Sequence, residues 1–381
     1  MTRFRLTVLI AACLTLVVPV ASAQTAKPTA KPAPVTKAAD SAAKLPAPIL
    51  AAFKQAYPNA TIKAATKEME NGKIEWEVES IDNGLARDLV YNPDGTVVEM
   101  EEQVAPASLP AAGVHGIAVA PDLGRAFVSN GRENTASIVD LKTLQITGSV
   151  KTGANPDCIL YEPGHKEVYT FNGRDKSATV FDAATGEVKA TIALPGKPEF
   201  AVVDVKAGRI YNNIEDTNEI AIIDTASHAM VAKWPIAPGE EASGLAIDLA
   251  HHRLFTVAGN NLLVALDSTT GKVLSTLPIG PGVDAAAYDP VTGFVFASSS
   301  DNTLTVARAD AAGKLALVQT LATPARSRTM TLDPKTHRIY VSAAEFTALA
   351  PAAPGAQPQR PQMVPGSFKV VVYEAKLGSS S

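Results

Sequence analysis

Two sets of polar residues recur along the chain at nearly constant spacing and could form a binding or catalytic site. The first set recurs every 41 to 44 residues and comprises His115, Asp157, Glu199, Ser243, Asp284 and Arg328. The second set follows the first by 17 residues in each repeat and comprises Arg132, Arg174, Asp216, Asn260, Asp301 and Glu345. Most of these residues are charged, although only 19% of the chain is charged. Charge is therefore concentrated at two repeating positions.

The arginines of the second set suit an anion. Asn130-Gly131-Arg132 returns one repeat later as Asn172-Gly173-Arg174. A guanidinium group binds a carboxylate or phosphate through two parallel hydrogen bonds. We therefore expect a small anionic ligand, a peptide or a protein partner. Turn geometry alone would also explain the Asn-Gly pairs, and polar residues at such positions can simply cap strand ends.

Six repeats anchored on an aromatic residue must position both sets. The anchors are Phe127, Tyr169, Tyr211, Phe255, Phe296 and Tyr340. Each repeat combines an alternating apolar run, a turn, the aromatic strand and a third strand that usually ends in Asp, and a period of this length is one four-stranded blade. We predict a mainly β chain with a β-propeller of six or seven blades over residues 110–376, and a polar tail over 377–381. Strands one and two of a blade are antiparallel, so both sets should lie on the channel face.

A separate small α+β module is predicted over residues 46–105. Apolar residues recur at helical spacing from Ile49 to Tyr57, and Pro58 ends that pattern. Three strand-like runs follow, and Asn92-Pro-Asp-Gly95 between the last two is typical of a hairpin turn. One helix on a small antiparallel sheet accounts for these signals.

The N-terminus predicts export. A basic start, an apolar run from Leu6 to Val20 and Ala21-Ser-Ala23 form a secretory signal over residues 1–23. Cys13 offers the alternative of a lipidated cysteine, although the apolar run continues beyond it. Residues 24–45 are rich in Ala, Lys and Pro and predict a flexible linker. We expect a periplasmic or secreted protein without a transmembrane segment.

Charge and cysteine content narrow the function classes. Without Arg3 and Arg5 the chain has 32 basic and 38 acidic residues, a balance that argues against electrostatic binding of nucleic acid. Cys158 would be the one cysteine of the mature chain, so an ordinary core rather than a disulfide must stabilise it. We expect a monomer.

Two family resemblances rest on short motifs. Phe53, Tyr57-Pro-Asn-Ala60, the strand Glu75-Trp-Glu-Val78 and the hairpin Tyr91-Asn-Pro-Asp-Gly-Thr-Val97 resemble the PepSY-like modules. Phe127-Val-Ser-Asn130, Tyr169-Thr-Phe-Asn172 and Tyr340-Val-Ser-Ala343 resemble the Tyr-Val-Thr-Asn signature of the YVTN-repeat, YncE-like propellers. The resemblances imply an exported propeller, usually of seven blades, behind an accessory binding module. They also suggest nucleic-acid binding, which the acidic charge opposes.

An enzymatic alternative rests on the acids of both sets. Asp157, Glu199, Asp216 and Asp284, together with His115 and Asn260, could converge on Ca²⁺ or Mg²⁺, which prefer hard oxygen ligands. Asp157, Glu199 and Asp284 are the main candidates, although no cofactor is the main expectation. The arrangement is similar to that of propeller lactonases, where a metal polarises a carbonyl or activates water. The alternative function is thus a metal-assisted lactonase or related hydrolase.

The last repeat has two further features. An insertion over residues 346–367, rich in Pro and Ala, follows Glu345, and the chain then supplies a third strand from Phe368 to Tyr373 but no fourth. An unpaired strand edge favours aggregation, so we predict that Thr96–Val104 completes the ring.

Overall fold

The computed structural model describes residues 4–9, 45–70, 73–82, 85–95, 97–102, 113–347, 363–364 and 367–375. The chain forms two compact units. The repeat unit is built mainly from Ala107–Ser342, and the module unit from Arg5–Pro106 together with Ala343–Glu374. No helix in the described residues is long and apolar enough to cross a membrane.

The module unit contains one helix and a four-stranded antiparallel sheet. Ile49 and Phe53 on the helix pack against Val78, Leu89 and Tyr91 of the sheet, and all five side chains are buried. The elements are α1 (Ala47–Ala56), β2 (Thr61–Glu70), β3 (Lys73–Asp82), β4 (Leu85–Tyr91) and β5 (Val97–Glu102), and the sheet order is β2-β3-β4-β5. The predicted helix and the last three strands are therefore present.

Strand β2 is an element that the sequence did not predict. Its residues Thr61–Glu70 mix Lys, Glu, Ala and Thr without a regular alternation of apolar and polar side chains, so they lack the period that indicates a half-buried strand. Antiparallel pairing with β3 along the whole strand holds it in the sheet instead. The predicted hairpin turn is confirmed, since Gly95 N donates to Asn92 O at 2.9 Å. Gly95 has a φ of +88° and lies against the Pro48 carbonyl, which leaves no room for a side chain.

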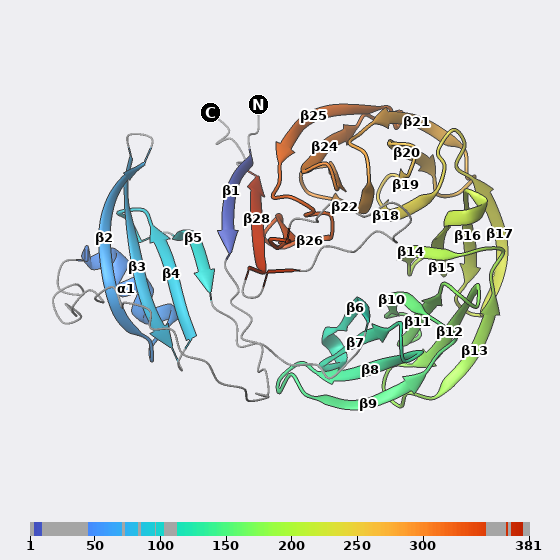
Figure 1. Ribbon diagram of the computed structural model, residues 1–381, viewed down its shortest axis with the longest axis horizontal. Coiled ribbons are helices and arrows are strands. Elements are labelled where there is room, and N and C mark those ends of the chain that lie inside the picture. Colours follow the sequence, from blue (N-terminus) through green and yellow to red (C-terminus); the bar gives the residue numbers. More distant parts are fainter. Residues whose placement is uncertain are drawn as a thin grey trace, which may run out of the picture. The chain divides into compact units, whose positions relative to one another are not determined.

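The repeat unit consists of antiparallel sheets arranged in a ring, with the fourth strands β9, β13, β17, β21 and β25 at the outer rim (Figure 1). The first strands contact one another in sequence, β6 with β10, β10 with β14, β14 with β18, β18 with β22 and β22 with β26. The first two blades comprise β6 (Val114–Ala120), β7 (Arg125–Asn130), β8 (Thr135–Asp140), β9 (Ile146–Lys151), β10 (Pro156–Glu162), β11 (Glu167–Asn172), β12 (Ser177–Asp182) and β13 (Val188–Ala193). The next two comprise β14 (Pro198–Asp204), β15 (Arg209–Ile214), β16 (Glu219–Asp224), β17 (Ala229–Pro235), β18 (Ala242–Asp248), β19 (Arg253–Ala258), β20 (Leu262–Asp267) and β21 (Val273–Pro278).

The last strands of the chain complete this inventory. The fifth blade comprises β22 (Val283–Asp289), β23 (Phe294–Ser299), β24 (Thr303–Ala309) and β25 (Leu315–Ala322). In the sixth repeat β26 (Met330–Asp333) pairs with β27 (Arg338–Ala343). Short 3₁₀ turns lie at η2 (Pro121–Leu123) and η3 (Glu215–Thr217). In the module unit, β28 (Lys369–Ala375) contains the predicted third strand and neighbours β1 (Phe4–Leu9) in sheet order.

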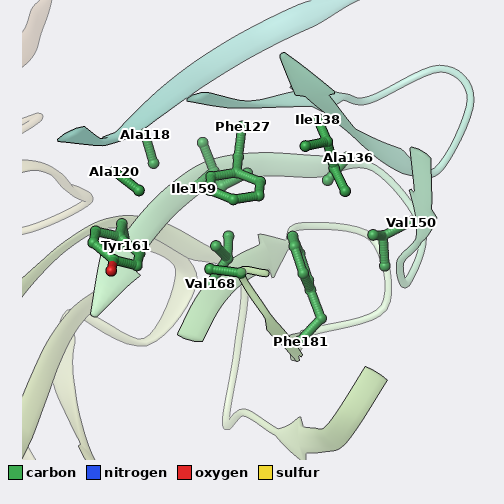
Figure 2. Packing of buried hydrophobic residues seen from close by; sticks show 11 residues of the cluster. Ala118, Ala120, Phe127, Ala136, Ile138, Val150, Ile159, Tyr161, Val168 and Phe181 are labelled. Carbon is green, nitrogen blue, oxygen red and sulfur yellow. The ribbon is translucent and has the colours of Figure 1, made fainter. Parts of the chain in front are cut away.

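Aromatic anchors pack between neighbouring blades. Phe127 and Phe181, from the first and second blades, meet edge to face with ring centroids 5.8 Å apart (Figure 2). Five of the six anchors are buried, and Tyr340 is half-buried. Truncating one buried phenylalanine to alanine costs about 3–5 kcal/mol of stability. The anchors therefore hold the blades together.

The neck of the insertion in the sixth repeat is closed by hydrogen bonds. Val364 N donates to the Glu345 carbonyl at 2.8 Å, and an isolated bridge pairs Phe346 with Met363. Most of residues 346–367 lie outside the described residues, as do the linker and most of the predicted signal peptide. Strand β5 pairs with β4 in the sheet of the module unit, and β1 rather than Thr96–Val104 neighbours β28, so the predicted closure by Thr96–Val104 is wrong.

Candidate functional site

A β-bulge recurs at the same point of the first strand in five blades. The pairing of strand one with strand two shifts there, so that two residues face one on the partner strand. The bulged pairs are 115–116, 157–158, 199–200, 243–244 and 284–285. Each pair begins with a residue of the first set. A bulge bends its strand and redirects a side chain, so the backbone irregularity explains why this position carries the polar residue.

One cavity of about 720 Å³ lies among the first strands of the repeat unit, and the first set lines it. Every blade contributes, because His115, Asp157, Glu199, Ser243, Asp284 and Arg328 all reach its wall. Glu215 and Glu241 add two more carboxylates. Val114, Ile117, Ile159, Phe200 and Val283 supply apolar surface. The structure thus brings the first set together at one site.

The main chain behind the first set is held by polar side chains. Five of its carbonyl groups each accept a side-chain hydrogen bond, and four of these bonds join neighbouring blades. The donors and acceptors are Ser129 to Asp157, Asn212 to Glu199, Asn213 to Ser243, Ser243 to Asp284 and Ser298 to Arg328. Each such bond contributes about 1 kcal/mol net, and together they fix the direction in which the ring side chains leave the backbone.

Glu199 and Glu215 share one cation. Lys197 Nζ lies 2.7 Å from Glu199 Oε1 and also pairs with Glu215 Oε2. Burial raises the pKa of Glu199 to about 7, because the hydrogen bond and charge of Lys197 only partly offset desolvation and Asp157 and Glu215 repel further charge. The pKa of Lys197 is lowered by burial but raised overall by its two carboxylate partners. Glu199 therefore changes charge near neutral pH.

The remaining charged groups of the cavity form looser pairs. His115 Nδ1 lies 3.4 Å from Asp157 Oδ1. On the other side, Asp284 accepts a hydrogen bond from Thr329 Oγ1 at 3.1 Å and lies 3.9 Å from Arg328 Nε. Glu241 makes no ion pair within the described residues. These side chains keep hydrogen-bonding capacity that a ligand can use.

Cys158 lies in the cavity wall without the properties of a nucleophile. It is a free thiol packed against the core of the second and third blades. Burial raises its pKa to about 12, with further repulsion from Asp157 and Glu199. The thiolate is the reactive form, so Cys158 acts as a small apolar residue at neutral pH.

The second set does not line the cavity, and all six of its members are exposed. The Asp216 carboxylate accepts hydrogen bonds from Lys176 Nζ and Lys197 N, both at 2.7 Å. Asn260 bonds to Pro238 O and Glu240 N, and Asp301 accepts from Thr303 Oγ1. Glu345 belongs to the module unit, where its N donates to Ser367 Oγ at 3.0 Å. Asp216, Asn260, Asp301 and Glu345 therefore stabilise turns, and Arg132 and Arg174 lie outside the cavity lining.

Residues that the sequence did not single out complete the site. Lys197 stands two residues before Glu199, while Glu215 and Glu241 lie outside both repeating positions. The residues two positions before each member of the first set include both Lys197 and Glu241, which stands two residues before Ser243. Phe200 follows Glu199 in the bulge, and its exposed position depends on the register shift rather than on any sequence motif.

The predicted metal ligands do not form a compact donor set. Among the described residues, no three His, Cys, Asp or Glu side chains are grouped closely enough to hold a metal ion. Asp157, Glu199 and Asp284 line the same cavity from different blades and have the partners given above. Binding of Ca²⁺ or Mg²⁺ stays a prediction.

Solved structures share this fold. Hydrazine synthase of Kuenenia stuttgartiensis is similar with a TM-score of 0.55 and 19% identity, covering 61% of this chain and 74% of that chain. The repeat unit is a β-propeller. The WD40 β-propeller domain of Doa1 matches with a TM-score of 0.52 and 13% identity, covering 82% of this chain and 92% of that chain. No family model and no curated protein matches the chain, so the propeller fold is what these likenesses show.

Proposed function

We propose that this chain is an exported binding protein whose propeller holds a small ligand in the axial cavity. The observation that carries the proposal is the convergence of the whole first set on one cavity. A volume of about 720 Å³ lies within the range of small-molecule sites, which is about 300–1,000 Å³. A rigid ring of blades with polar side chains at its centre suits recognition without large movement. A peptide that inserts one side chain would use the same surface.

Export and family membership form part of the proposal. The basic start, apolar run and Ala21-Ser-Ala23 support a cleaved signal, with lipidation at Cys13 as its rival. The aromatic anchors and the helix-and-hairpin motifs support the YVTN-repeat and PepSY-like resemblances. Mass spectrometry of the mature N-terminus tests the first point. A chain beginning at Gln24 is expected, and an N-terminus acylated at Cys13 would contradict it.

A cavity-blocking variant tests the binding site. Purified mature protein is screened by thermal shift against cationic, neutral and anionic fragments, together with Ser243→Trp and the control Ser149→Trp. Ser243 lines the cavity, whereas Ser149 is exposed on the outer strand β9. We expect fragments that stabilise the wild type and the control to lose their effect on Ser243→Trp.

A second blocking variant controls for misfolding of Ser243→Trp. Ile117→Trp changes a cavity side chain that is 63% exposed and forms no hydrogen bond through its side chain. Fragments that stabilise both blocked variants as strongly as the wild type would contradict the proposed site.

Hydrolysis is a second candidate, favoured by Glu199. A carboxylate with a pKa of about 7 is poised to act as a general base near neutral pH. Lactone hydrolysis is therefore measured with and without Ca²⁺ for the wild type and Glu199→Gln. Turnover that is lost in the variant would support the enzyme, and turnover that Glu199→Gln leaves unchanged would contradict it.

A further inference from the structure

We propose that the axial cavity selects an organic cation, namely an ammonium group carried on an apolar body. This inference rests on the proposed function and names the chemical class of its ligand. Two independent properties of the cavity wall carry it. One is an excess of negative charge, and the other is a set of apolar side chains in the wall that are exposed among the described residues.

The charge excess follows from the lining residues and their partners. Five carboxylates line the cavity: Asp157, Glu199, Glu215, Glu241 and Asp284. Two cations offset them, because Lys197 is shared by Glu199 and Glu215 while Arg328 lies near Asp284. Among the described residues, the five carboxylates therefore outnumber these two cations by three, and His115 lies beside Asp157. A low-dielectric cleft lined by one sign of charge focuses the field and attracts counter-charged ligands.

The environment of Glu199 also disfavours further negative charge in the cavity. Its side chain is 18% exposed, and burial together with Asp157 and Glu215 raises its pKa despite the Lys197 contact. A ligand cation would stabilise the ionised form. A positively charged ligand would therefore balance carboxylate charge that the residues of the cavity leave uncompensated.

The apolar wall favours an organic cation over a hydrated metal ion. Phe200 is 41% exposed, Ile117 is 63% exposed and Val114 is 48% exposed, although all three line the cavity. An ammonium group over an aromatic face gains about 0.5–2 kcal/mol, and apolar contact adds about 25 cal/mol for each Å² removed from water. These side chains offer nothing to a metal ion.

An anionic ligand fits the cavity less well. Arg132 and Arg174, on which the expectation of an anion depended, lie outside the lining. Among the described lining residues, Arg328 is the one side chain that carries a permanent positive charge, and Asp284 lies beside it. A carboxylate or phosphate entering the cavity would meet more repulsion than attraction.

Three probes of similar size test the charge preference. Mature protein is titrated at pH 8 by calorimetry with phenethylammonium, 2-phenylethanol and 3-phenylpropanoate. We expect phenethylammonium to bind at least about tenfold more tightly than the alcohol, a difference of about 1.4 kcal/mol, with the propanoate weakest. Added salt should lower the affinity for phenethylammonium most, because salt screens the attraction between its charge and the carboxylates.

Matched variants locate the interaction. Glu241→Gln and Phe200→Leu should each lower the affinity for phenethylammonium by about threefold to tenfold. The first variant loses a negative charge, and the second loses the cation–π attraction. Glu187→Gln makes the same charge change on an exposed turn outside the cavity and should leave the affinity unchanged. Equal losses in all three variants would overturn the inference.

The outcomes separate the ligand class from the proposed function. Alcohol or propanoate binding as tightly as the cation, and lost in Ser243→Trp, would overturn the cation inference and leave the binding cavity standing. Calcium chloride that binds while phenethylammonium does not would likewise overturn it. No heat with any probe, and no fragment whose effect Ser243→Trp abolishes, would overturn both.

Discussion

The two repeating sets of polar residues have the same spacing but different environments. Four members of the first set, Asp157, Glu199, Ser243 and Asp284, are half-buried in the cavity wall, whereas every member of the second set is exposed. Four first-set carbonyls accept hydrogen bonds from neighbouring blades, and the side chains of the set line the cavity. In the second set, Asp216, Asn260 and Asp301 are instead used by the turns that they occupy.

This difference shows that a polar residue recurring in every blade is not by itself a sign of a site. The second set occupies tight turns, where carboxylates and amides accept main-chain hydrogen bonds and cap strand ends. Five members of the first set occupy bulges on the innermost strands, where side chains are redirected toward the axis. Backbone geometry therefore decides which of the two sets can meet a ligand.

The largest effect on stability should come from adding a side chain at Gly244, where two blades approach each other closely behind the first set. A Cβ at Gly244 would lie 2.5 Å from Ala286 N and 2.6 Å from the Asp284 carbonyl, which are main-chain atoms of the next blade. Gly244→Ala should therefore lower the free energy of unfolding by about 3 kcal/mol, because the blades must separate. Chemical denaturation measures this change.

A glycine in the outer strand β9 provides the control. A Cβ at Gly148 would meet Ile138 Cδ1 at 3.5 Å, an ordinary contact. Gly148→Ala should change stability by less than about 1 kcal/mol. Equal losses in the two variants would show that the inner bulges are no more constrained than the rim.

Glu199 should make stability depend on pH. Between its ordinary pKa of 4.5 and its folded value of about 7, the folded chain holds a proton that the unfolded chain has released. Stability from this group therefore falls as pH rises through that window. Relative to the wild type, Glu199→Gln should gain about 2–3 kcal/mol between pH 5 and pH 8, because burial raises the pKa of Glu199 and the contact with Lys197 only partly offsets it. Urea denaturation at both pH values measures the difference, and a constant difference would contradict the account.

A smaller effect is expected in the second set. The hydrogen bond from Lys176, and then that from Lys197 N, lowers the pKa of Asp216, so its contribution is present at neutral pH and lost on acidification. The pair is exposed, so Asp216→Asn should cost only about 0.5–1 kcal/mol at pH 7. Phenethylammonium affinity should stay within about twofold of the wild type. A larger loss of affinity would show that Asp216 contacts the ligand, and would contradict the conclusion that only the first set lies at the site.

The smallest effect is expected from the two exposed arginines. Arg132→Gln combined with Arg174→Gln should change the affinity of neither phenethylammonium nor 3-phenylpropanoate by more than about twofold, because neither residue lines the cavity. Calorimetry on the double variant measures both. A tenfold loss of propanoate binding would instead support an anion site on the rim.

The sequence predicted the propeller because its signals are local and repeated. The aromatic anchors recur at the length of a blade and are buried, and turn residues mark the ends of the strands. Strand β2 escaped prediction because pairing with β3, rather than an apolar period in Thr61–Glu70, holds it in place. The sequence also placed the first set on a common face, and all six members line one cavity.

The rest of the site depends on register and on contacts between blades. Glu215 reaches the cavity from a turn, and Glu241 from the position two residues before Ser243, where most other blades have no charged residue. Phe200 is exposed there because a bulge disrupts the alternation of β14. The separation of the two sets also followed from the bulges, which periodicity in the sequence does not reveal.

A crystal structure of the mature protein soaked with phenethylammonium tests the central claim most directly. The account predicts the ligand inside the axial cavity, with its ring against Phe200 or Ile117 and its ammonium group within hydrogen-bond distance of the lining carboxylates. An empty cavity in crystals grown at saturating ligand, or a ligand bound only at Arg132, Arg174 or the outer strands, would contradict it.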